Sequence, residues 1–215
     1  MTLGAVLFDL DGTLADTLPV CFVAFRNAVR GSGGPALSDA EIQALFGPSE
    51  DGMMQSVLPE VREKALALYF EEYQRQLRLC PAPFPEIVSA LALLKERRVP
   101  AGLVTGKGQV TALMSLRHFR VDDAFDAVET GSPAGIVKAE AIRRLLARWR
   151  VMPNQAVYVG DAAADMLAAK EAGVTAVGAA WAHGAQVSEL SAAGADVIFT
   201  RAREFLAWIE SRTGL

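Results

Sequence analysis

Two aspartates stand two residues apart directly after a short apolar run near the amino terminus. The run 5–8 is followed by Asp9, then by Asp11 and Gly12. Carboxylates held this close repel each other, so their charge is costly unless a cation or a reaction uses it. One can attack an electrophile while the other gives and takes a proton. Gly12 permits a sharp turn that lets backbone approach a ligand. The pair predicts a site for covalent and acid–base chemistry.

Further polar residues come after later apolar runs. Thr105 follows the run 101–104, and the stretch "VGDAAAD" places Asp161 at a strand tip and Asp165 one helical turn later. Lys138 opens a helical pattern before that strand. A hydroxyl and free N–H groups at a helix start suit a phosphate oxygen. Carboxylates that converge with a lysine suit Mg²⁺, a hard ion often completed by substrate phosphate.

The elements that must position these residues alternate along the chain. Short apolar runs typical of strands occur at 5–8, 101–104, 125–128, 156–159, 175–178 and 196–199. Segments of helical length come after the later runs, and the most periodic are 138–150 and 201–212. This alternation predicts an α/β protein with a doubly wound parallel sheet. Ligands in such sheets bind at the carboxyl ends of the strands, where the polar residues above would meet.

One interval, 16–80, contains no convincing strand. Ser38 and Glu41 have the spacing of a capping box, which predicts the start of a short helix. Longer helix-like patterns occupy 19–30 and 59–79. Three prolines in 81–85 favour extended backbone where the chain returns. We expect an α/β core domain of residues 1–15 and 81–215 and a small all-helical domain of residues 16–80, inserted after the first strand.

Composition narrows the class of protein. The chain has 215 residues, a net charge of −4 and two cysteines, so no disulfide framework is indicated. Lys and Arg are scattered, which argues against a nucleic-acid partner. The longest weakly apolar run, 172–182, is shorter than the ~18 residues of a membrane span. No basic leader precedes Asp9. We expect a cytoplasmic monomer or homodimer with a small anionic substrate and no membrane partner.

Four motifs occur in an order that identifies a family resemblance. Asp9-Leu-Asp11-Gly-Thr13, Thr105, Lys138 and Gly160-Asp161-Ala-Ala-Ala-Asp165 resemble the four motifs of the haloacid dehalogenase superfamily of phosphatases. The helical interval resembles the cap of its phosphoglycolate phosphatase and β-phosphoglucomutase branch. The resemblance implies a Rossmann-like core, a central first strand flanked by the second and fourth, and a helical cap that closes over the site.

The resemblance also implies roles for matching residues. Asp9 would be the nucleophile that forms an aspartyl-phosphate, and Asp11 would protonate the leaving alcohol and then activate water. Thr105 and Lys138 would bind the transferring phosphoryl group. Asp9, the backbone carbonyl of Asp11 and Asp161 would hold Mg²⁺, and Asp165 would orient ligand waters or Lys138. The implied metal-binding set is therefore Asp9, Asp11, Asp161 and Asp165.

Several residues keep two interpretations. Gly106 stands where the family often has Asn, which removes one side-chain contact to substrate, and Ala139 stands where many relatives have Pro. In the stretch 47–50, Ser49 or Glu50 would contact the leaving group, or the stretch is a plain turn between helices. Lys107 is a phosphate ligand or an exposed loop lysine. The aspartates, Thr105 and Lys138 could also serve only as turn formers, caps or a solvated helix residue.

The function that these features favour is hydrolysis of a small phosphorylated metabolite, similar to phosphoglycolate, with Mg²⁺. Asp11 favours a phosphatase over a dehalogenase, because an alkoxide leaving group benefits from a proton donor and a halide does not. A sugar phosphomutase of the β-phosphoglucomutase type would use the same two aspartates. A phosphate-accepting regulatory or binding module without turnover is an alternative from another class.

Overall fold

The computed structural model describes residues 3–135 and 138–213. Its centre is a six-stranded sheet in the order β3-β2-β1-β4-β5-β6, and the neighbouring strands pair in parallel. The strands are β1 (Ala5–Phe8), β2 (Ala101–Gly108), β3 (Ala127–Gly131), β4 (Ala156–Gly160), β5 (Thr175–Ala179) and β6 (Val197–Phe199). The predicted fold class is confirmed, with β1 central between β2 and β4.

The central strand is buried on both faces, which is why its sequence is apolar without alternation. All four residues of β1 are fully buried. Phe8 lies in register with Leu103 of β2 and with Val159 of β4. The residues that come after these three positions therefore emerge at one edge of the sheet.

Two strands differ from the prediction. The sequence pattern ends β2 near residue 104, yet the strand continues to Gly108, and its register against β3 shifts between Val104 and Gly108. The strands approach closely there, because a Cβ on Gly131 would overlap the carbonyl of Gly106. β3 begins at residue 127 rather than 125, since the Asp126 carboxylate accepts a hydrogen bond from the Ala101 N–H at 2.9 Å and ties the preceding turn to β2.

The interval between β1 and β2 is helical, as expected. It contains α1 (Leu18–Gly31), α2 (Asp39–Gln43), α3 (Glu50–Val57), η1 (Pro59–Val61), α4 (Arg62–Gln76) and η2 (Leu77–Leu79). The predicted capping box of Ser38 and Glu41 starts α2. The segment 59–79 is not one helix, because short 3₁₀ turns flank α4. The sequence pattern does not predict α3, because this short helix contains a glycine and a serine, which are weak helix formers.

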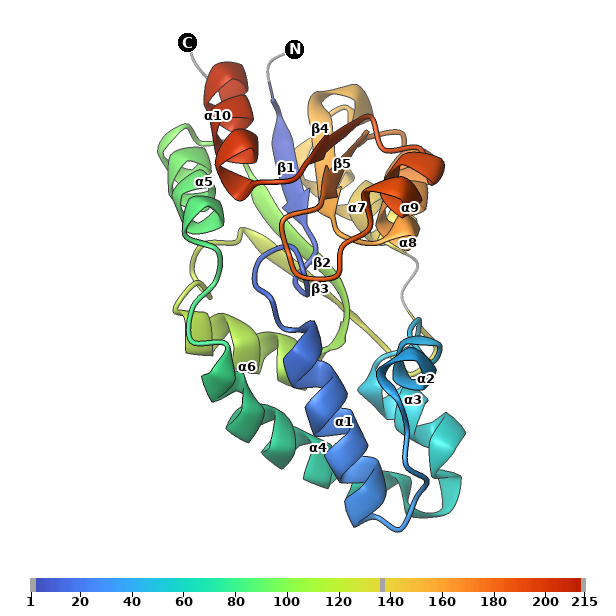
Figure 1. The fold of residues 1–215 in the computed structure, drawn as a ribbon. Coiled ribbons are helices and arrows are strands. Elements are labelled where there is room, and N and C mark those ends of the chain that lie inside the picture. Colours follow the sequence, from blue (N-terminus) through green and yellow to red (C-terminus); the bar gives the residue numbers. More distant parts are fainter. Residues whose placement is uncertain (1–2, 136–137, 214–215) are drawn as a thin grey trace.

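Figure 1 shows α1 to α4 gathered beyond the carboxyl end of β1, and α1 packs along α4. The two segments that connect this insert to the sheet touch each other. The Phe84 N–H donates to the Leu14 carbonyl at 3.0 Å. The division into a core of 1–15 and 81–215 and a cap of 16–80 stays a prediction about independent domains.

Helices cover both faces of the sheet. One face carries α5 (Pro85–Glu96), α6 (Gln109–Phe119) and α10 (Ala202–Thr213), and the other carries α7 (Lys138–Trp149), α8 (Ala163–Ala172) and α9 (Val187–Ala192). The Leu3 N–H donates to the Arg212 carbonyl at 3.4 Å, so the start of the described chain lies against the end of α10. Figure 1 shows both at the end of the sheet opposite the helical insert.

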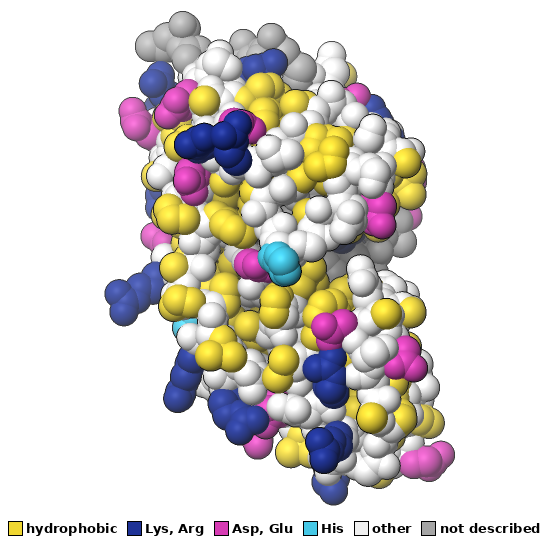
Figure 2. Space-filling model, viewed as in Figure 1, with side chains coloured by type: hydrophobic (Ala, Val, Ile, Leu, Met, Phe, Trp, Pro, Cys, Tyr) yellow, Lys and Arg dark blue, Asp and Glu magenta, His cyan; other side chains and the backbone are white. Residues whose placement is uncertain are grey.

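The surface carries mixed charge on the face seen in Figure 2. Lys and Arg side chains are interspersed there with acidic and hydrophobic ones. Across residues 3–135 and 138–213, none of the helices has the length and apolar character to cross a membrane.

Candidate active site

The carboxylate cluster forms where β1, β4 and α8 meet. Ligand oxygens of Asp9, Asp161 and Asp165 lie within 4.8 Å of one another. Asp9 directly follows β1, Asp161 directly follows β4, and Asp165 lies in the first turn of α8. Parallel pairing of β1 with β4 brings the first two together, and α8 folds the third back over them. The structure therefore brings together the three aspartates that the sequence pattern places near one another.

Lys138, the first residue of α7, bridges two of these carboxylates. Its ammonium donates to Asp9 Oδ2 at 2.9 Å and to Asp165 Oδ1. Burial alone would lower the pKa of Lys138, but the charges of Asp165 and Asp9 hold it well above its usual range. The lysine is therefore a permanent cation beside Asp9.

Both carboxylate oxygens of Asp165 accept hydrogen bonds, and one of them holds Lys138. Its Oδ1 also accepts from the Tyr158 hydroxyl at 3.1 Å, and its Oδ2 accepts from the Ala162 N–H at 3.1 Å. The Tyr158 hydroxyl lies 2.8 Å from the Val104 carbonyl as well, which links β4 to β2. Sequence reasoning missed Tyr158, since a tyrosine inside an apolar strand carries no signal of a polar role.

The cluster holds excess negative charge. Three carboxylates face one ammonium group. Burial raises the pKa of Asp9 to about 6 although Lys138 opposes the shift. Burial, followed by the charges of Asp165 and Asp9, raises the pKa of Asp161 well above its usual range. Oxygen ligands with uncompensated negative charge fit a hard divalent cation such as Mg²⁺.

The turn after β1 packs tightly against Asp161. Gly12 has a φ of +70°, and a Cβ at this position would overlap the Asp161 carboxylate. The Gly12 N–H donates to the Ala15 carbonyl at 2.9 Å, and the Trp181 ring N–H donates to the Thr13 carbonyl at 3.0 Å. Only glycine fits here, so the turn and the strand end at Asp161 are locked together.

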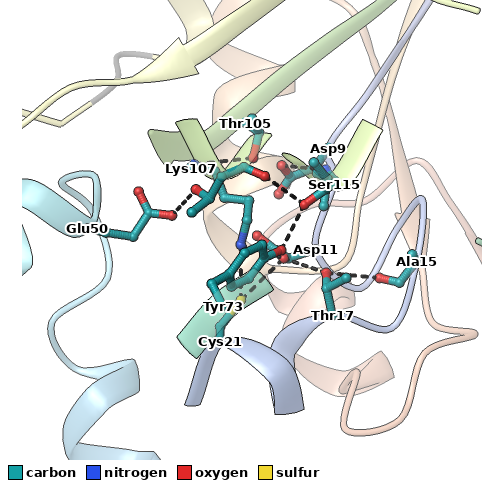
Figure 3. Close-up of polar contacts among 12 residues, drawn as sticks. Asp9, Asp11, Ala15, Thr17, Cys21, Glu50, Tyr73, Thr105, Lys107 and Ser115 are labelled. Carbon is teal, nitrogen blue, oxygen red and sulfur yellow. Dashed lines mark hydrogen bonds and ion pairs between the residues drawn. The ribbon is translucent and has the colours of Figure 1, made fainter. Parts of the chain in front are cut away.

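Asp11 lies outside the cluster of three carboxylates. Its Oδ1 accepts from the Thr17 hydroxyl and, at 3.2 Å, from the Lys107 ammonium (Figure 3). Its side chain is 19% exposed, whereas that of Lys107 is only 4% exposed. The interpretation of Lys107 as an exposed loop lysine is therefore wrong. Because β2 extends to residue 108, Lys107 belongs to the strand and points into the protein.

The remaining predicted residues lie in β2 and at the start of α3. Thr105 is buried, and its hydroxyl accepts from the Lys107 N–H at 3.3 Å. A Cβ on Gly106 would meet no atom within 4 Å, so the space where the family often has an Asn side chain is open. Ser49 starts α3 and is buried, and its N–H donates to the Ser132 carbonyl at 2.8 Å.

Glu50 holds the insert to the sheet. Its Oε2 accepts from the Gly108 N–H at 2.7 Å, and its Oε1 accepts from the Thr111 hydroxyl. One turn further along α6, on the same face as Thr111, the Tyr73 and Ser115 hydroxyls lie 2.8 Å apart. The stretch 47–50 is therefore more than a turn between helices, because it contacts the core.

Comparisons with known proteins agree with this geometry. Residues 6–179 match the model of the family described as haloacid dehalogenase-like hydrolase. The chain is 30% identical over 182 residues to the tyrosine-protein kinase PtkA of Mycobacterium tuberculosis, covering 83% of this chain and 62% of that protein's length. It is 28% identical over 191 residues to a phosphoglycolate phosphatase of Neisseria meningitidis, covering 84% of this chain and 81% of the relative.

A solved structure is similar to this one over a larger share of the chain. A putative β-phosphoglucomutase from Thermotoga maritima superposes with a TM-score of 0.74 at 27% identity, covering 98% of this chain and 99% of that one. The family match includes the strand ends that carry Asp9 and Asp161, Thr105 within β2, and the helix start at Lys138. The chain belongs to the haloacid dehalogenase-like hydrolase family.

Proposed function

We propose that the protein is a Mg²⁺-dependent phosphatase that hydrolyses a small phosphorylated metabolite through an aspartyl-phosphate on Asp9. The observation that carries this proposal is the position of Asp9, a buried carboxylate at a strand end whose Oδ2 is 2.9 Å from the Lys138 ammonium. That cation favours the ionised, nucleophilic form of Asp9 and would attract the phosphoryl oxygens. Family membership and the phosphatase named among the relatives support the same activity.

The residues around Asp9 fit the cation. Asp9, the backbone carbonyl of Asp11 and Asp161 would hold Mg²⁺, which when bound would supply positive charge against the phosphoryl group. Asp165 would orient Lys138, because both of its oxygens already accept hydrogen bonds within the protein. Thr105 would donate its hydroxyl to a phosphoryl oxygen. Gly106 would leave room beside it, and Ser49 would approach from the insert.

The reaction divides into two proton-balanced steps. An Asp9 oxygen forms a bond to phosphorus while the ester P–O bond breaks, and the leaving oxygen takes its electron pair and a proton from Asp11. Asp11 then removes a proton from water, whose oxygen forms a bond to phosphorus while the bond between phosphorus and the Asp9 oxygen breaks and Asp9 keeps the electron pair. The products are the alcohol and inorganic phosphate, and both aspartates return to their starting state. The docked insert would exclude bulk water during the first step.

The substrate class is part of the proposal. A small ester similar to phosphoglycolate is favoured by the resemblance to one branch of the family and by the relative from Neisseria. A β-phosphoglucomutase activity would use the same Asp9 and Asp11, and the similar structure from Thermotoga keeps it as the second candidate.

The test is phosphate release from a panel of phosphate esters with Mg²⁺, with EDTA, and with the Asp9→Asn variant. Turnover that requires both Mg²⁺ and Asp9 is expected. Phosphoglycolate and sugar phosphates belong in the panel, and conversion of a sugar phosphate to its isomer without phosphate release would favour the mutase. Phosphorylation of Asp9 by a small phosphodonor, with no release from any ester, would favour the regulatory alternative.

A further inference from the structure

Lys107 is a second buried cation near the site, separate from the carboxylate cluster. Its ammonium lies 3.2 Å from Asp11 Oδ1, 3.0 Å from the Cys21 sulfur and 4.4 Å from the centre of the Tyr73 ring (Figure 3). These partners come from the turn after β1, from α1 and from α4, while Lys107 belongs to β2. The mechanism above gives this lysine no role.

The arrangement fixes the ammonium in place. Burying a lysine is expensive unless its charge is paired and its donors are used. Here one carboxylate, one thiol sulfur and one aromatic face surround the group. Burial alone would lower the pKa of Lys107, and the charge of Asp11 raises it well above the usual value. The lysine is a rigid cation rather than a mobile surface side chain.

The two carboxylate oxygens of Asp11 have different surroundings. Oδ1 receives the Thr17 hydroxyl, the Lys107 ammonium and, at 3.5 Å, the Cys21 thiol. No hydrogen bond between the described residues goes to Oδ2. A carboxyl oxygen already surrounded by donors is a poor site for a proton, so the proton to be transferred belongs on the other oxygen.

We propose that Lys107 is a positioning residue that fixes Oδ1 of Asp11 and so presents Oδ2 to the oxygen of the leaving group. The inference rests on the proposed phosphatase function and adds a determinant of its first step. Lys107 does not touch the reacting atoms. It acts by holding the acid in one orientation, so its loss would matter most where protonation of the leaving group is needed.

The need for a proton from Asp11 depends on the leaving group of the substrate. An alkyl phosphate expels a strongly basic alkoxide and needs the proton, whereas p-nitrophenyl phosphate expels a stable phenolate that departs without it. The ratio of kcat/KM for the alkyl ester to kcat/KM for the aryl ester isolates this effect, because kcat/KM covers only the steps through formation of the aspartyl-phosphate. The shared hydrolysis of that intermediate does not enter the ratio.

The experiment compares wild type with Lys107→Met on p-nitrophenyl phosphate and on the alkyl phosphate that wild type hydrolyses best. We expect kcat/KM for the alkyl ester to fall on the order of tenfold more than for the aryl ester, since acid catalysis contributes about 10²- to 10⁴-fold and only its alignment is lost. Lys107→Arg, which keeps a cationic donor, should restore part of the ratio.

Tyr73→Phe is the matched control. It keeps the ring against Lys107 and removes only the contact with the Ser115 hydroxyl, so it should change both substrates by the same factor. Equal losses in Lys107→Met, or no loss, would overturn the proposal.

A second variant decides the outcome if Lys107→Met does not fold. Thr17→Val removes another donor to Asp11 Oδ1 without leaving a buried charge, and a preferential loss on the alkyl ester is again expected. Equal losses there would refute the idea that Oδ1 is held. Failure of wild type to hydrolyse either ester would instead contradict the proposed function itself.

Discussion

Replacing the nucleophile should stabilise the metal-free protein. Burial raises the pKa of Asp9 from 3.8 to about 6, and one unit corresponds to about 1.36 kcal/mol, so ionised Asp9 costs the folded state about 3 kcal/mol. Asp9→Asn keeps the volume and removes that charge. The free energy of unfolding without Mg²⁺ should therefore be about 3 kcal/mol greater for the variant above pH 6.

The pH dependence fixes the sign of the effect. Because the folded-state pKa of Asp9 lies above the unfolded value, its contribution to stability is fully present below pH 3.8 and is lost as pH rises through about 6. The gain of Asp9→Asn over wild type should therefore vanish near pH 3.8, grow between these two values and level off above them.

Urea unfolding of both proteins in EDTA, at pH 5 and at pH 8, measures this difference. Thermal unfolding at pH 8 should show a rise in Tm of about 6 to 12 °C for the variant, given about 2 to 4 °C per kcal/mol in a chain of this size. Added Mg²⁺ should stabilise wild type more than the variant. An Asp9→Asn protein that is equally stable or less stable at pH 8 would refute the inference that the buried, ionised Asp9 destabilises the metal-free fold.

Three other substitutions have defined outcomes. Asp161→Asn should raise the Mg²⁺ concentration needed for half-maximal phosphate release, or abolish release, and an unchanged Mg²⁺ dependence would contradict its role as a ligand. Glu50→Gln should weaken the hydrogen bonds to Gly108 and Thr111 and lower the free energy of unfolding in urea by about 1 to 3 kcal/mol. Proteolysis of the insert should also be faster, and unchanged proteolysis would argue against this attachment of the insert to the sheet. Gly12→Ala should lower Tm and turnover together because it combines a positive φ with overlap of Asp161, and a fully active, equally stable variant would exclude this constraint.

The sheet and the carboxylate cluster were predictable because each depends on local patterns. Apolar runs that end in Asp9 and Asp161 define both the strands and the polar residues at their carboxyl ends, and parallel pairing then brings the carboxylates to one edge. Lys138 was placed by its position at a helix start. These features require no knowledge of side-chain packing.

The contacts of Lys107 and Glu50 could not be predicted, because no local sequence pattern contains them. The glycines on either side of Lys107 are typical of a loop, yet β2 continues through both of them to Gly108. The close approach of the two strands depends on Gly131 in β3, where a Cβ would overlap the carbonyl of Gly106. The partner of Lys107, Tyr73, lies in α4, so the contact exists only once the insert has docked. Glu50 lies in the stretch 47–50, whose sequence is compatible with a plain turn, and its contact with Gly108 shows more than a turn only in three dimensions. Contact of this stretch with a leaving group stays a prediction.

The meeting of Leu3 with the end of α10 has a practical consequence. These segments lie at the amino ends of the strands, whereas the candidate catalytic side chains lie at the carboxyl ends, with the helical insert beyond them (Figure 1). A surface tether or a fluorescent label attached beside Leu3 or beside the end of α10 would therefore lie at the opposite end of the sheet from the candidate active site. Immobilised or single-molecule assays of the proposed activity can therefore use attachment points that leave the candidate site uncovered.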